Sequence, residues 1–439
     1  MPDEVGDDKN LGGSGLQVIE DITCPVCGCL CDDLRVTLQG QQLQAIEGAC
    51  SLAKPWYEAV CRASATTHEV TGIPASLDEA VGKAIALLRK SRAPLIYGLS
   101  RSSTDGQRKA IELAEMLGAT IDTTASVCHG PSIMAIQQVG ESTSSLGEVR
   151  QRSDLVVYWG CDPVRSHPRH LERYSAEPLS EFLPGGRADR TIVVIDTQET
   201  ETSQLADVFL RVSPDRDYEL ICEVRSLLLS FRLGDGPHPM PVSPEAERLF
   251  QLLSTCRYGA VFFGLGIAQG RLGHQTVAVL LRLVAEMNAI TRMIARRMRI
   301  PGDVAGADSV LCWQTGFPFA VNLGRGYPRY NPGEFSANEL LERGEVDCCL
   351  FVGSESISEF STAARAAICH LPVVTLESAH VLPEVRPDVL FRTAVYGVHC
   401  RGTGYRMDEI PISMRPFLPG NLPTDAVVIE KLAERLRDS

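Results

Sequence analysis

Four cysteines near the start of the chain have the spacing of a metal-binding set. Cys24, Cys27 and Cys31 form a C-x2-C-x3-C loop, and Cys50 follows as a remote fourth thiol. Such a set suits either a tetrahedral zinc ion or a [4Fe–4S] cluster. Zinc sites usually pair two short C-x-x-C-type knuckles, so three cysteines in one loop favour the cluster. Buried thiols without a metal are the remaining alternative, and Cys29 is expected to be a neighbour of the ligands rather than a ligand.

A second set of reactive residues lies in two polar loops further along the chain. Cys128 stands beside His129 among Ser, Gly and Pro residues, where it could act as a thiolate nucleophile or a metal ligand. Arg299 belongs to an arginine-rich loop, and it follows Gly264 at a distance similar to that at which Cys128 follows Gly98. Taken alone, Cys128 could be a packed thiol without a function. Taken alone, the arginines could form a face that is solvated or that contacts another chain of an assembly. Their matched positions favour two loops that face each other in an active site.

The sequence from about residue 70 onward predicts the elements that position these loops. Amphipathic helical patterns alternate with short apolar runs that end in Gly or Asp, which is typical of βαβ units and a parallel sheet. A helix is expected over 76–90, a buried strand over 93–98 and a second helix over 106–118. Ligands of parallel sheets bind at the carboxyl ends of the strands, where backbone N–H groups are free to meet phosphates.

The apolar runs recur in the same order in the second half of the chain. The matched runs are 95–99 with 261–265, 156–162 with 349–355, and 191–196 plus 206–210 with 372–377 plus 387–391. Three ordered matches suggest a duplicated α/β unit and a long ligand, with two nucleotide ends, lying across both copies. The expected divisions are a disordered acidic tail over 1–17, a Cys-rich [4Fe–4S]-type domain over 18–67, and two similar Rossmann-like α/β units with parallel sheets over 68–250 and 251–439.

The composition excludes several function classes. The formal net charge is −13, so nucleic acid is not an expected partner. No apolar run reaches the roughly 18 residues of a membrane span. The first residues lack the basic start and apolar core of a signal peptide, so the 15 cysteines are expected to stay reduced in the cytoplasm. No P-loop motif occurs, and the glycines near Gly264 are too loosely spaced to indicate NAD.

Longer motifs carry a family resemblance that runs from about Cys24 to the C-terminus. They are Cys-Pro-Val-Cys-Gly-Cys-Leu-Cys-Asp-Asp at 24–33, Ala-Ser-Val-Cys-His-Gly-Pro-Ser at 125–132, Tyr-Trp-Gly-Cys-Asp-Pro at 158–163, Gly-Phe-Pro-Phe-Ala-Val at 316–321 and Gly-Tyr-Pro-Arg-Tyr-Asn-Pro-Gly at 326–333. The sequence resembles the B subunit of formylmethanofuran dehydrogenase and the related B subunit of the bacterial formyltransferase/hydrolase complex. Both belong to the molybdopterin oxidoreductase superfamily.

The resemblance implies a function for the N-terminal cysteines. Cys24, Cys27, Cys31 and Cys50 would hold a [4Fe–4S] cluster. Lys54, which taken alone is an ordinary surface lysine, would lie between the cluster and a pterin.

The resemblance also implies a tungsten or molybdenum centre. Cys128 would be the ligand of the metal in a bis(pyranopterin guanine dinucleotide) cofactor, with His129 and Arg299 lining the site where CO2 is reduced to formate. The residues expected to hold this cofactor are Lys54, Gly160, Asp162, Asp196, Thr197, Gly264 and Gly353.

The same resemblance implies that the chain works in a complex. The superfamily's C-terminal pterin-binding barrel is missing from the sequence, and the family supplies it as a small D-type subunit. The other expected partners are an amidohydrolase-like A subunit and a C subunit, and the expected carrier of the one-carbon group is of the methanofuran type.

One segment departs from the family pattern. Arg299 is followed by Ile-Pro-Gly-Asp at 300–303, where the methanogenic enzymes are expected to carry Gly-His and Asn. Two hypotheses follow from the loss of a polar residue beside the metal. In the first, the chain is a redox subunit that interconverts CO2/formate and formyl groups carried on methanofuran, with metal chemistry at Cys128. In the second, the metal cofactor is lost and the chain is a structural subunit of a complex acting between formyl-tetrahydromethanopterin and formate.

Overall fold

The computed structural model describes residues 15–63, 67–234, 241–300, 302–354 and 356–438. Residues 1–14 of the expected acidic tail, and Pro301, lie outside this set. Strand β1 (Leu16–Ile22) begins before the expected end of the tail at residue 17, because Leu16 already pairs with Gln39 of the neighbouring strand. Within the described residues, strand structure is therefore already present at Leu16 and Gln17, inside the range expected for the tail.

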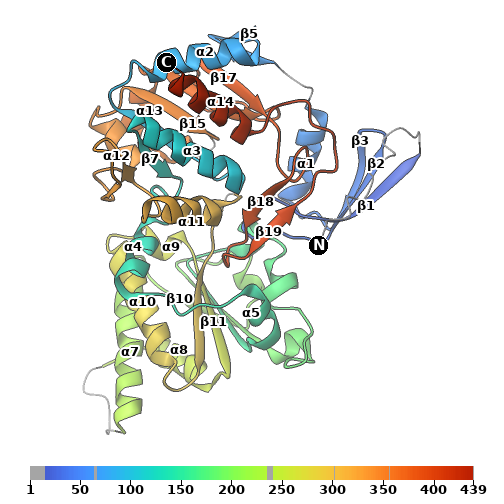
Figure 1. Cartoon of the computed structure of the whole chain (residues 1–439). Coiled ribbons are helices and arrows are strands. Elements are labelled where there is room, and N and C mark those ends of the chain that lie inside the picture. Colours follow the sequence, from blue (N-terminus) through green and yellow to red (C-terminus); the bar gives the residue numbers. More distant parts are fainter. Residues whose placement is uncertain (1–14, 64–66, 235–240, 301, 355, 439) are drawn as a thin grey trace, which may run out of the picture.

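An N-terminal module carries the cysteine loop. It is a small antiparallel sheet of order β1-β2-β3, with β2 at Leu34–Gln39 and β3 at Gln42–Glu47. The cysteine loop joins β1 to β2, and Cys50 lies just before helix α1 (Ala53–Arg62). The module lies on one flank of the molecule, beside the C-terminal hairpin of β18 (Gly402–Tyr405) and β19 (Pro411–Met414) (Figure 1).

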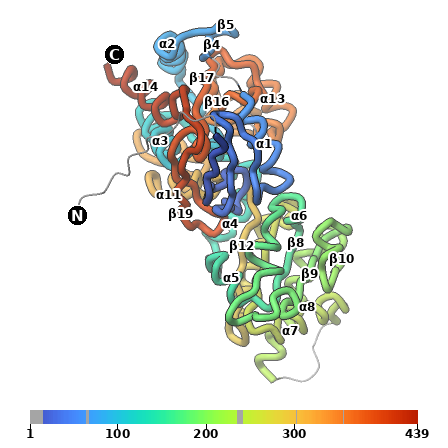
Figure 2. Tube along the Cα trace, turned by 90° about the vertical axis from the view of Figure 1, so that its right-hand side faces the viewer, coloured from blue at the N-terminus to red at the C-terminus, as the bar shows by residue number. Residues whose placement is uncertain are grey.

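Two larger sheets lie toward opposite ends of the elongated molecule (Figure 2). Among the described residues, one sheet has the order β14-β13-β7-β6-β15-β16-β17-β4-β5 and the other the order β10-β9-β8-β11-β12. The strands of the larger sheet are β4 (His68–Val70), β5 (Ile73–Ala75), β6 (Pro94–Gly98), β7 (Thr120–Thr123), β13 (Val321–Asn322), β14 (Arg329–Tyr330), β15 (Cys348–Val352), β16 (Val373–Ser378) and β17 (Val389–Thr393). Those of the smaller sheet are β8 (Leu155–Trp159), β9 (Thr191–Asp196), β10 (Val208–Arg211), β11 (Tyr258–Phe263) and β12 (Arg292–Arg297).

Each sheet is built from both predicted repeats. The series β17-β16-β15-β6-β7 and β10-β9-β8-β11-β12 are parallel throughout, and the matched sequence runs occupy equivalent places in them. The first repeat gives β6 and β7 to the larger sheet but β8, β9 and β10 to the smaller one. The second repeat gives β11 and β12 to the smaller sheet but β15, β16 and β17 to the larger one. The α/β class with parallel sheets is thus confirmed. The units expected over 68–250 and 251–439 do not coincide with the two sheets, because the chain crosses from one sheet to the other within each repeat.

Helices cover the apolar strands of both sheets. In the larger sheet α2, α3, α11 and α14 pack on one face and α12 and α13 on the other; in the smaller sheet α4, α7, α8, α9 and α10 pack on one face. The bounds are α2 (Leu77–Leu88), α3 (Thr104–Leu117), α4 (Gly130–Val139), α5 (Leu146–Arg152), α6 (Pro163–Ser166), α7 (Asp217–Leu233), α8 (Pro244–Thr255), α9 (Leu265–Ala268), α10 (Gly273–Met287), α11 (Val304–Thr315), α12 (Ala337–Glu342), α13 (Thr362–Ile368) and α14 (Asp425–Arg437). Within the described residues no helix is long and apolar enough to cross a membrane.

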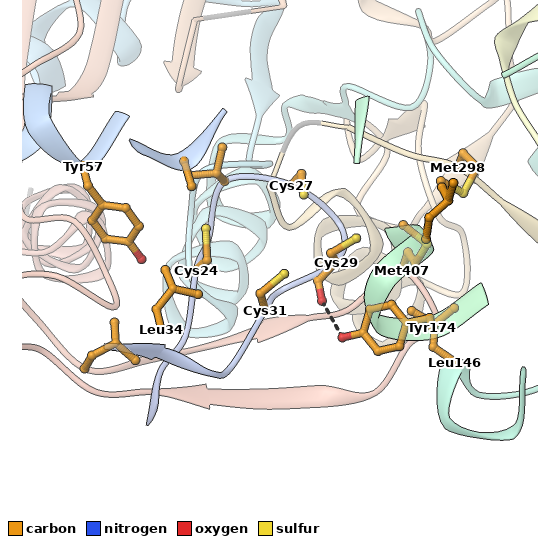
Figure 3. Packing of buried hydrophobic residues seen from close by; sticks show 14 of the residues in the cluster. Cys24, Cys27, Cys29, Cys31, Leu34, Tyr57, Leu146, Tyr174, Met298 and Met407 are labelled. Atoms are coloured by element: carbon orange, nitrogen blue, oxygen red, sulfur yellow. Dashed lines mark hydrogen bonds between the residues drawn. The ribbon is translucent and has the colours of Figure 1, made fainter. Parts of the chain in front are cut away.

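The cysteine loop has no core of its own. Its cysteines belong to one continuous apolar cluster with Tyr158, Phe262 and Met298, and with α5, on the remaining face of the smaller sheet. Figure 3 shows Met298 and Tyr174 next to the cysteine loop. The expected domain over 18–67 is therefore joined to the α/β part through a shared core.

The local signals in the sequence act as expected at the start of the larger sheet. Ser76 caps α2 in a reciprocal capping box with Glu79, and β6 follows as a fully buried strand. Helix α3 ends at Gly118, which takes the left-handed conformation with a φ of +60°. These elements confirm the predicted helix–strand–helix series.

Gly98 lies where strands from the two repeats come closest, and Gly98→Ala tests that contact. Its φ is +115°, and a Cβ there would lie 2.5 Å from the carbonyl oxygen of Val352 on β15. We expect Gly98→Ala to lower the free energy of unfolding by about 3 kcal/mol. Gly82→Ala is the matched control, since Gly82 is exposed on α2 and an added Cβ meets no atom within 4 Å. It should raise stability by about 0.5–1 kcal/mol. Urea unfolding measures both changes, and wild-type stability in Gly98→Ala would contradict the close approach.

Candidate functional site

The predicted cluster ligands lie together. Cys24, Cys27, Cys31 and Cys50 line one small cavity, which Cys29 also borders. The backbone N–H of Cys24 donates a hydrogen bond to the carbonyl oxygen of Cys31 (2.8 Å), which closes the loop. No group of three or more His, Cys, Asp or Glu side chains that could share a single metal ion occurs within the described part of the chain.

The thiols in this cavity differ in their environments. Burial raises the pKa of Cys24 well above its usual value and also raises the pKa of Cys50. A hydrogen bond with the Cys29 thiol lowers the pKa of Cys27, and the same contact raises the pKa of Cys29. Cys29 therefore acts as a hydrogen-bonding neighbour that favours the thiolate of Cys27.

Lys54 lies next to the cavity along the chain but not inside it. It is an exposed residue in the first turn of α1, and its backbone N–H donates to the carbonyl oxygen of Cys50 (3.0 Å). Its side chain does not line the cysteine cavity in this chain.

The cysteine loop packs directly on the loop that follows β12. A Cβ on Gly28 would lie 2.9 Å from the carbonyl oxygen of Arg299, so only glycine allows this approach. The backbone N–H of Gly302 donates to the carbonyl oxygen of Val26 (3.1 Å). The two motifs singled out in the sequence, which are more than 270 residues apart, are therefore in backbone contact.

Cys128 and His129 form the turn between β7 and α4. The backbone N–H of Cys128 donates to the carbonyl oxygen of Ala125 (3.0 Å). His129 is fully buried, with Nε2 3.1 Å from the carbonyl oxygen of Met298 and Nδ1 3.1 Å from the hydroxyl of Ser132. Burial holds the pKa of His129 well below its usual value, so the ring is neutral. Nε2 then donates to Met298, and the ring fixes the backbone just before Arg299.

Arg299 is buried at the same place. Its Nη2 lies 2.6 Å from Oδ2 of Asp308 on α11, and the hydroxyl of Thr123 donates to Oδ1 of Asp308 (2.7 Å). Arg299 and Asp308 form an ion pair, but the contact lacks the geometry of a hydrogen bond. Nε and Nη2 of Arg299 therefore have no hydrogen-bond acceptor among the described residues. Burial raises the pKa of Cys128 to about 11, while the charge of Arg299 opposes that rise. The structure thus brings Cys128, His129 and Arg299 together, from equivalent loops after β7 and β12.

Other predicted cofactor residues lie at the carboxyl edges of the sheets. Gly160 and Gly264 follow β8 and β11, and a Cβ on Gly264 would lie 2.6 Å from the carbonyl oxygen of Gly160. Asp162 accepts hydrogen bonds from the backbone and hydroxyl of Thr202 (3.1 and 2.5 Å). Asp196 accepts a bond from the backbone of Thr197 (2.7 Å), and Thr197 is exposed. The hydrogen bonds of Asp162 and Asp196 join residues at the same edge of the smaller sheet. These residues therefore form a part of the site that is separate from the Cys128 turn.

A cavity at the equivalent edge of the larger sheet contains residues that the sequence patterns did not single out. It has a volume of about 270 Å³ and includes the predicted residue Gly353. Its other lining residues include Trp56, Arg101, Glu377, Ser378 and His380. The repeat could have revealed Glu377 and Ser378, because they lie at the carboxyl end of β16 as Asp196 and Thr197 lie at that of β9. Arg101 also donates to the carbonyl oxygen of Val26 (3.1 Å), which joins this cavity to the cysteine loop.

Comparison with known proteins agrees with this geometry. No family model matches the chain. The B subunit of the tungsten-containing formylmethanofuran dehydrogenase 2 of Methanocaldococcus jannaschii is 34% identical over 436 residues, which is 96% of this chain and 99% of that protein. The chain belongs to the family of formylmethanofuran dehydrogenase B subunits. The corresponding protein of Methanococcus maripaludis is 32% identical over 96% of the chain and 99% of its own length.

A bacterial branch of relatives is more distant. The B subunit of the formyltransferase/hydrolase complex of Methylorubrum extorquens is 25% identical over 65% of this chain and 74% of its own length. A chain in the crystal structure of that complex (FhcABCD) with methylofuran has a TM-score of 0.70 and 21% identity, and the match covers 85% of this chain and 99% of that one. At this identity the likeness shows the fold. The family resemblance inferred from the motifs is confirmed by the methanogen relatives.

A buried carboxyl beside the site predicts a pH-dependent stability. Burial raises the pKa of Asp303 to about 8, although it accepts hydrogen bonds from Tyr405, Gly306 and Gln107. The folded chain binds the proton of Asp303 more tightly than the unfolded chain does. The contribution of this proton to the free energy of unfolding is therefore complete below about pH 4 and is lost as the pH rises to about 8. Between about pH 4 and about pH 8, Asp303→Asn should remove a dependence of the free energy of unfolding on pH of up to about 1.4 kcal/mol per pH unit. Urea unfolding at several pH values measures it, and an unchanged slope would contradict the assignment.

Proposed function

We propose that this chain is the redox subunit of a formylmethanofuran dehydrogenase-type complex. In this proposal Cys24, Cys27, Cys31 and Cys50 hold a [4Fe–4S] cluster, and Cys128 binds tungsten or molybdenum in a bis-pterin cofactor. The reaction would interconvert CO2/formate and formyl groups on a carrier of the methanofuran type. The observation that carries the proposal is the backbone contact between Gly28 in the cysteine loop and Arg299 beside Cys128.

The donor sets fit the two groups. Four thiols around one small cavity match the ligand count of a cubane cluster. Cys128 lies in a turn beside the buried cation of Arg299, whose Nε and Nη2 have no hydrogen-bond acceptor among the described residues although Asp308 pairs with it. Such a cation could favour a thiolate ligand and an anionic substrate. Gly353, Glu377 and Ser378 at one sheet edge, and Gly160, Asp162 and Asp196 at the other, offer backbone and polar groups for the two ends of a long cofactor.

The residues of this chain would act chiefly by orientation and charge. The bound metal would supply the two-electron chemistry, and the cluster would carry electrons to and from it. Neutral His129 holds the carbonyl of Met298 and so sets the direction of the Arg299 side chain. The Arg299 guanidinium would then hold formate by charge-assisted hydrogen bonds, in a place that burial shields from water.

The relatives suggest the assembly in which this chain works. The formyltransferase/hydrolase relative belongs to a complex named FhcABCD. We infer that this chain assembles in the cytoplasm with an amidohydrolase-like A subunit, a C subunit and a small D-type subunit that supplies the pterin-binding barrel.

A second candidate function is that of a non-redox structural subunit of a formyl-transferring hydrolase. The ion pair between Arg299 and Asp308 favours it, because Asp308 already balances the charge that an anionic substrate would need. Ile300, which stands where the family pattern has polar residues, is half exposed and apolar. In this alternative the cysteine loop and Cys128 turn serve as scaffold, and hydrolysis takes place on a partner chain.

The cluster assignment predicts the iron content of the complex. Purified without oxygen, the complex should contain about four iron atoms per copy of this chain. Cys24→Ser should lose most of that iron, because a missing thiolate opens the cluster. Cys61→Ser is the matched control, as Cys61 lies on α1 and does not line the cysteine cavity. Element analysis and visible absorption measure both variants; two or fewer iron atoms in the wild type, or zinc in place of iron, would reject the assignment.

Cys128→Ala separates the two candidate functions. If Cys128 is the metal ligand, tungsten or molybdenum content and formate oxidation should each fall at least about 100-fold while the complex still assembles. If the chain is a scaffold, the wild-type complex contains almost no tungsten or molybdenum, and Cys128→Ala hydrolyses formyl groups at the wild-type rate. Metal analysis with parallel assays of formate oxidation and formyl hydrolysis decides between them.

A further inference from the structure

The segment from His167 to Ser175 contacts both loops that carry the proposed centres. Nε2 of His167 donates to the carbonyl oxygen of Arg299 (2.9 Å). The hydroxyl of Tyr174 donates to the carbonyl oxygen of Cys29 (3.3 Å), as Figure 3 shows. The end of the segment is a π-helical turn (Leu171–Ser175), a distortion that is frequent at functional sites. The segment therefore sets the cysteine loop against the Arg299 loop.

Arg169, in the same segment, lies at the cysteine cavity. Its side chain is 15% exposed and is one of those that line the cavity. Both of its terminal nitrogens bind Asp33, with Nη1 2.7 Å from Oδ1 and Nη2 2.8 Å from Oδ2. A Cβ on Gly48 would lie 3.4 Å from Nη1, so the guanidinium also reaches the chain that leads to Cys50. Arg169 thus spans the two sides of the cavity, one bearing Cys31 and the other Cys50.

The charge of Arg169 is balanced by exposed partners. Asp33 is 44% exposed and Glu172, which also pairs with Arg169, is 46% exposed. Removal of the guanidinium would leave Glu172 without this ion pair and Asp33 paired with Arg173 alone, and it would open the mouth of the cavity to water. The loss of this positive charge would disfavour the addition of an electron to a cluster held by thiolates, since reduction makes the cluster more negative and its potential depends on nearby charge.

We propose that Arg169 is a positioning residue for the cysteine cavity, which closes its mouth and raises the reduction potential of the cluster bound there. The second half of this proposal rests on the proposed [4Fe–4S] cluster. The first half rests on the contacts of Arg169 alone and holds for any group bound by the four cysteines.

The test uses the full complex with three variants of this chain. Arg169→Gln removes the charge and the fork-shaped contact, whereas Arg169→Lys keeps the charge but not the fork. Arg165→Gln is the matched control, because Arg165 lies just before the same segment with a 74% exposed side chain and only a 3.9 Å contact to Glu201. A redox titration with dithionite, followed by electron paramagnetic resonance, measures the one-electron potential of the cluster. Mass spectrometry of iodoacetamide labelling in metal-free complex measures how accessible Cys31 and Cys50 are.

The expected results separate charge from closure. Arg169→Gln should shift the reduction equilibrium about tenfold toward the oxidised cluster, which is about 59 mV for one electron. Arg169→Lys should keep the potential near the wild-type value. Both Arg169 variants should label Cys31 and Cys50 at least fivefold faster, and Arg165→Gln should change neither measurement.

Each contrary result overturns one of the two parts of the proposal, the effect of charge on the potential or the closing of the cavity. An unchanged potential in Arg169→Gln, with the wild-type cluster intact, overturns the electrostatic part. Labelling of Cys31 and Cys50 at the wild-type rate overturns the closing part. A wild-type complex without iron rejects the proposed cluster and with it the electrostatic part, and the labelling result then decides the closing part by itself.

Discussion

The exchange of strands between the two repeats is the constraint on which the rest of the structure depends. β6 pairs with β15 and β8 with β11, so each sheet is completed by strands from the other half of the chain. These junctions are close backbone contacts, and Gly98 and Gly264 have no room for a side chain beside Val352 and Gly160. The chain crosses from one sheet to the other after β7 and again after β12, so the loops that follow these two strands are brought to one place. The meeting of Cys128 with Arg299 follows from the topology.

Much of the fold could be predicted from the sequence because its signals are local. Apolar runs, the cap at Ser76 and the glycine end at Gly118 fix the strands and helices. The order of the repeats was also visible, and it recurs in the order of strands within each sheet. The pairing between repeats could not be predicted, since a parallel strand carries no sequence mark of its partner. For this reason the boundary expected at residue 250 divides the repeats but does not divide the two sheets.

The candidate site divides in a similar way. Residue type and spacing were enough to single out the four cysteines, Cys128 and Arg299, and the matched loops suggested their meeting. The contacts of His167 with Arg299 and of Arg169 with Asp33 could not be predicted, because each joins residues more than 100 positions apart. The pair of Asp308 with Arg299 is closer in the sequence but was also missed. No periodicity marks such side chains. Glu377 is different, because its match to Asp196 in the repeat was available.

The shared core of the cysteine loop bears on both candidate functions. The loop packs on Tyr158 and Phe262 of the smaller sheet, so the thiol cavity forms only when that sheet is folded. If a metal group binds the four cysteines as proposed, its binding would be linked to folding of the sheet and of the Arg299 loop, because ligand binding to the folded state stabilises everything that folds with it. A chain that lost its redox chemistry would still need these cysteines for stability. Retention of the cysteine loop is therefore compatible with either function, and the side chains around Cys128 and Arg299 are what distinguish them.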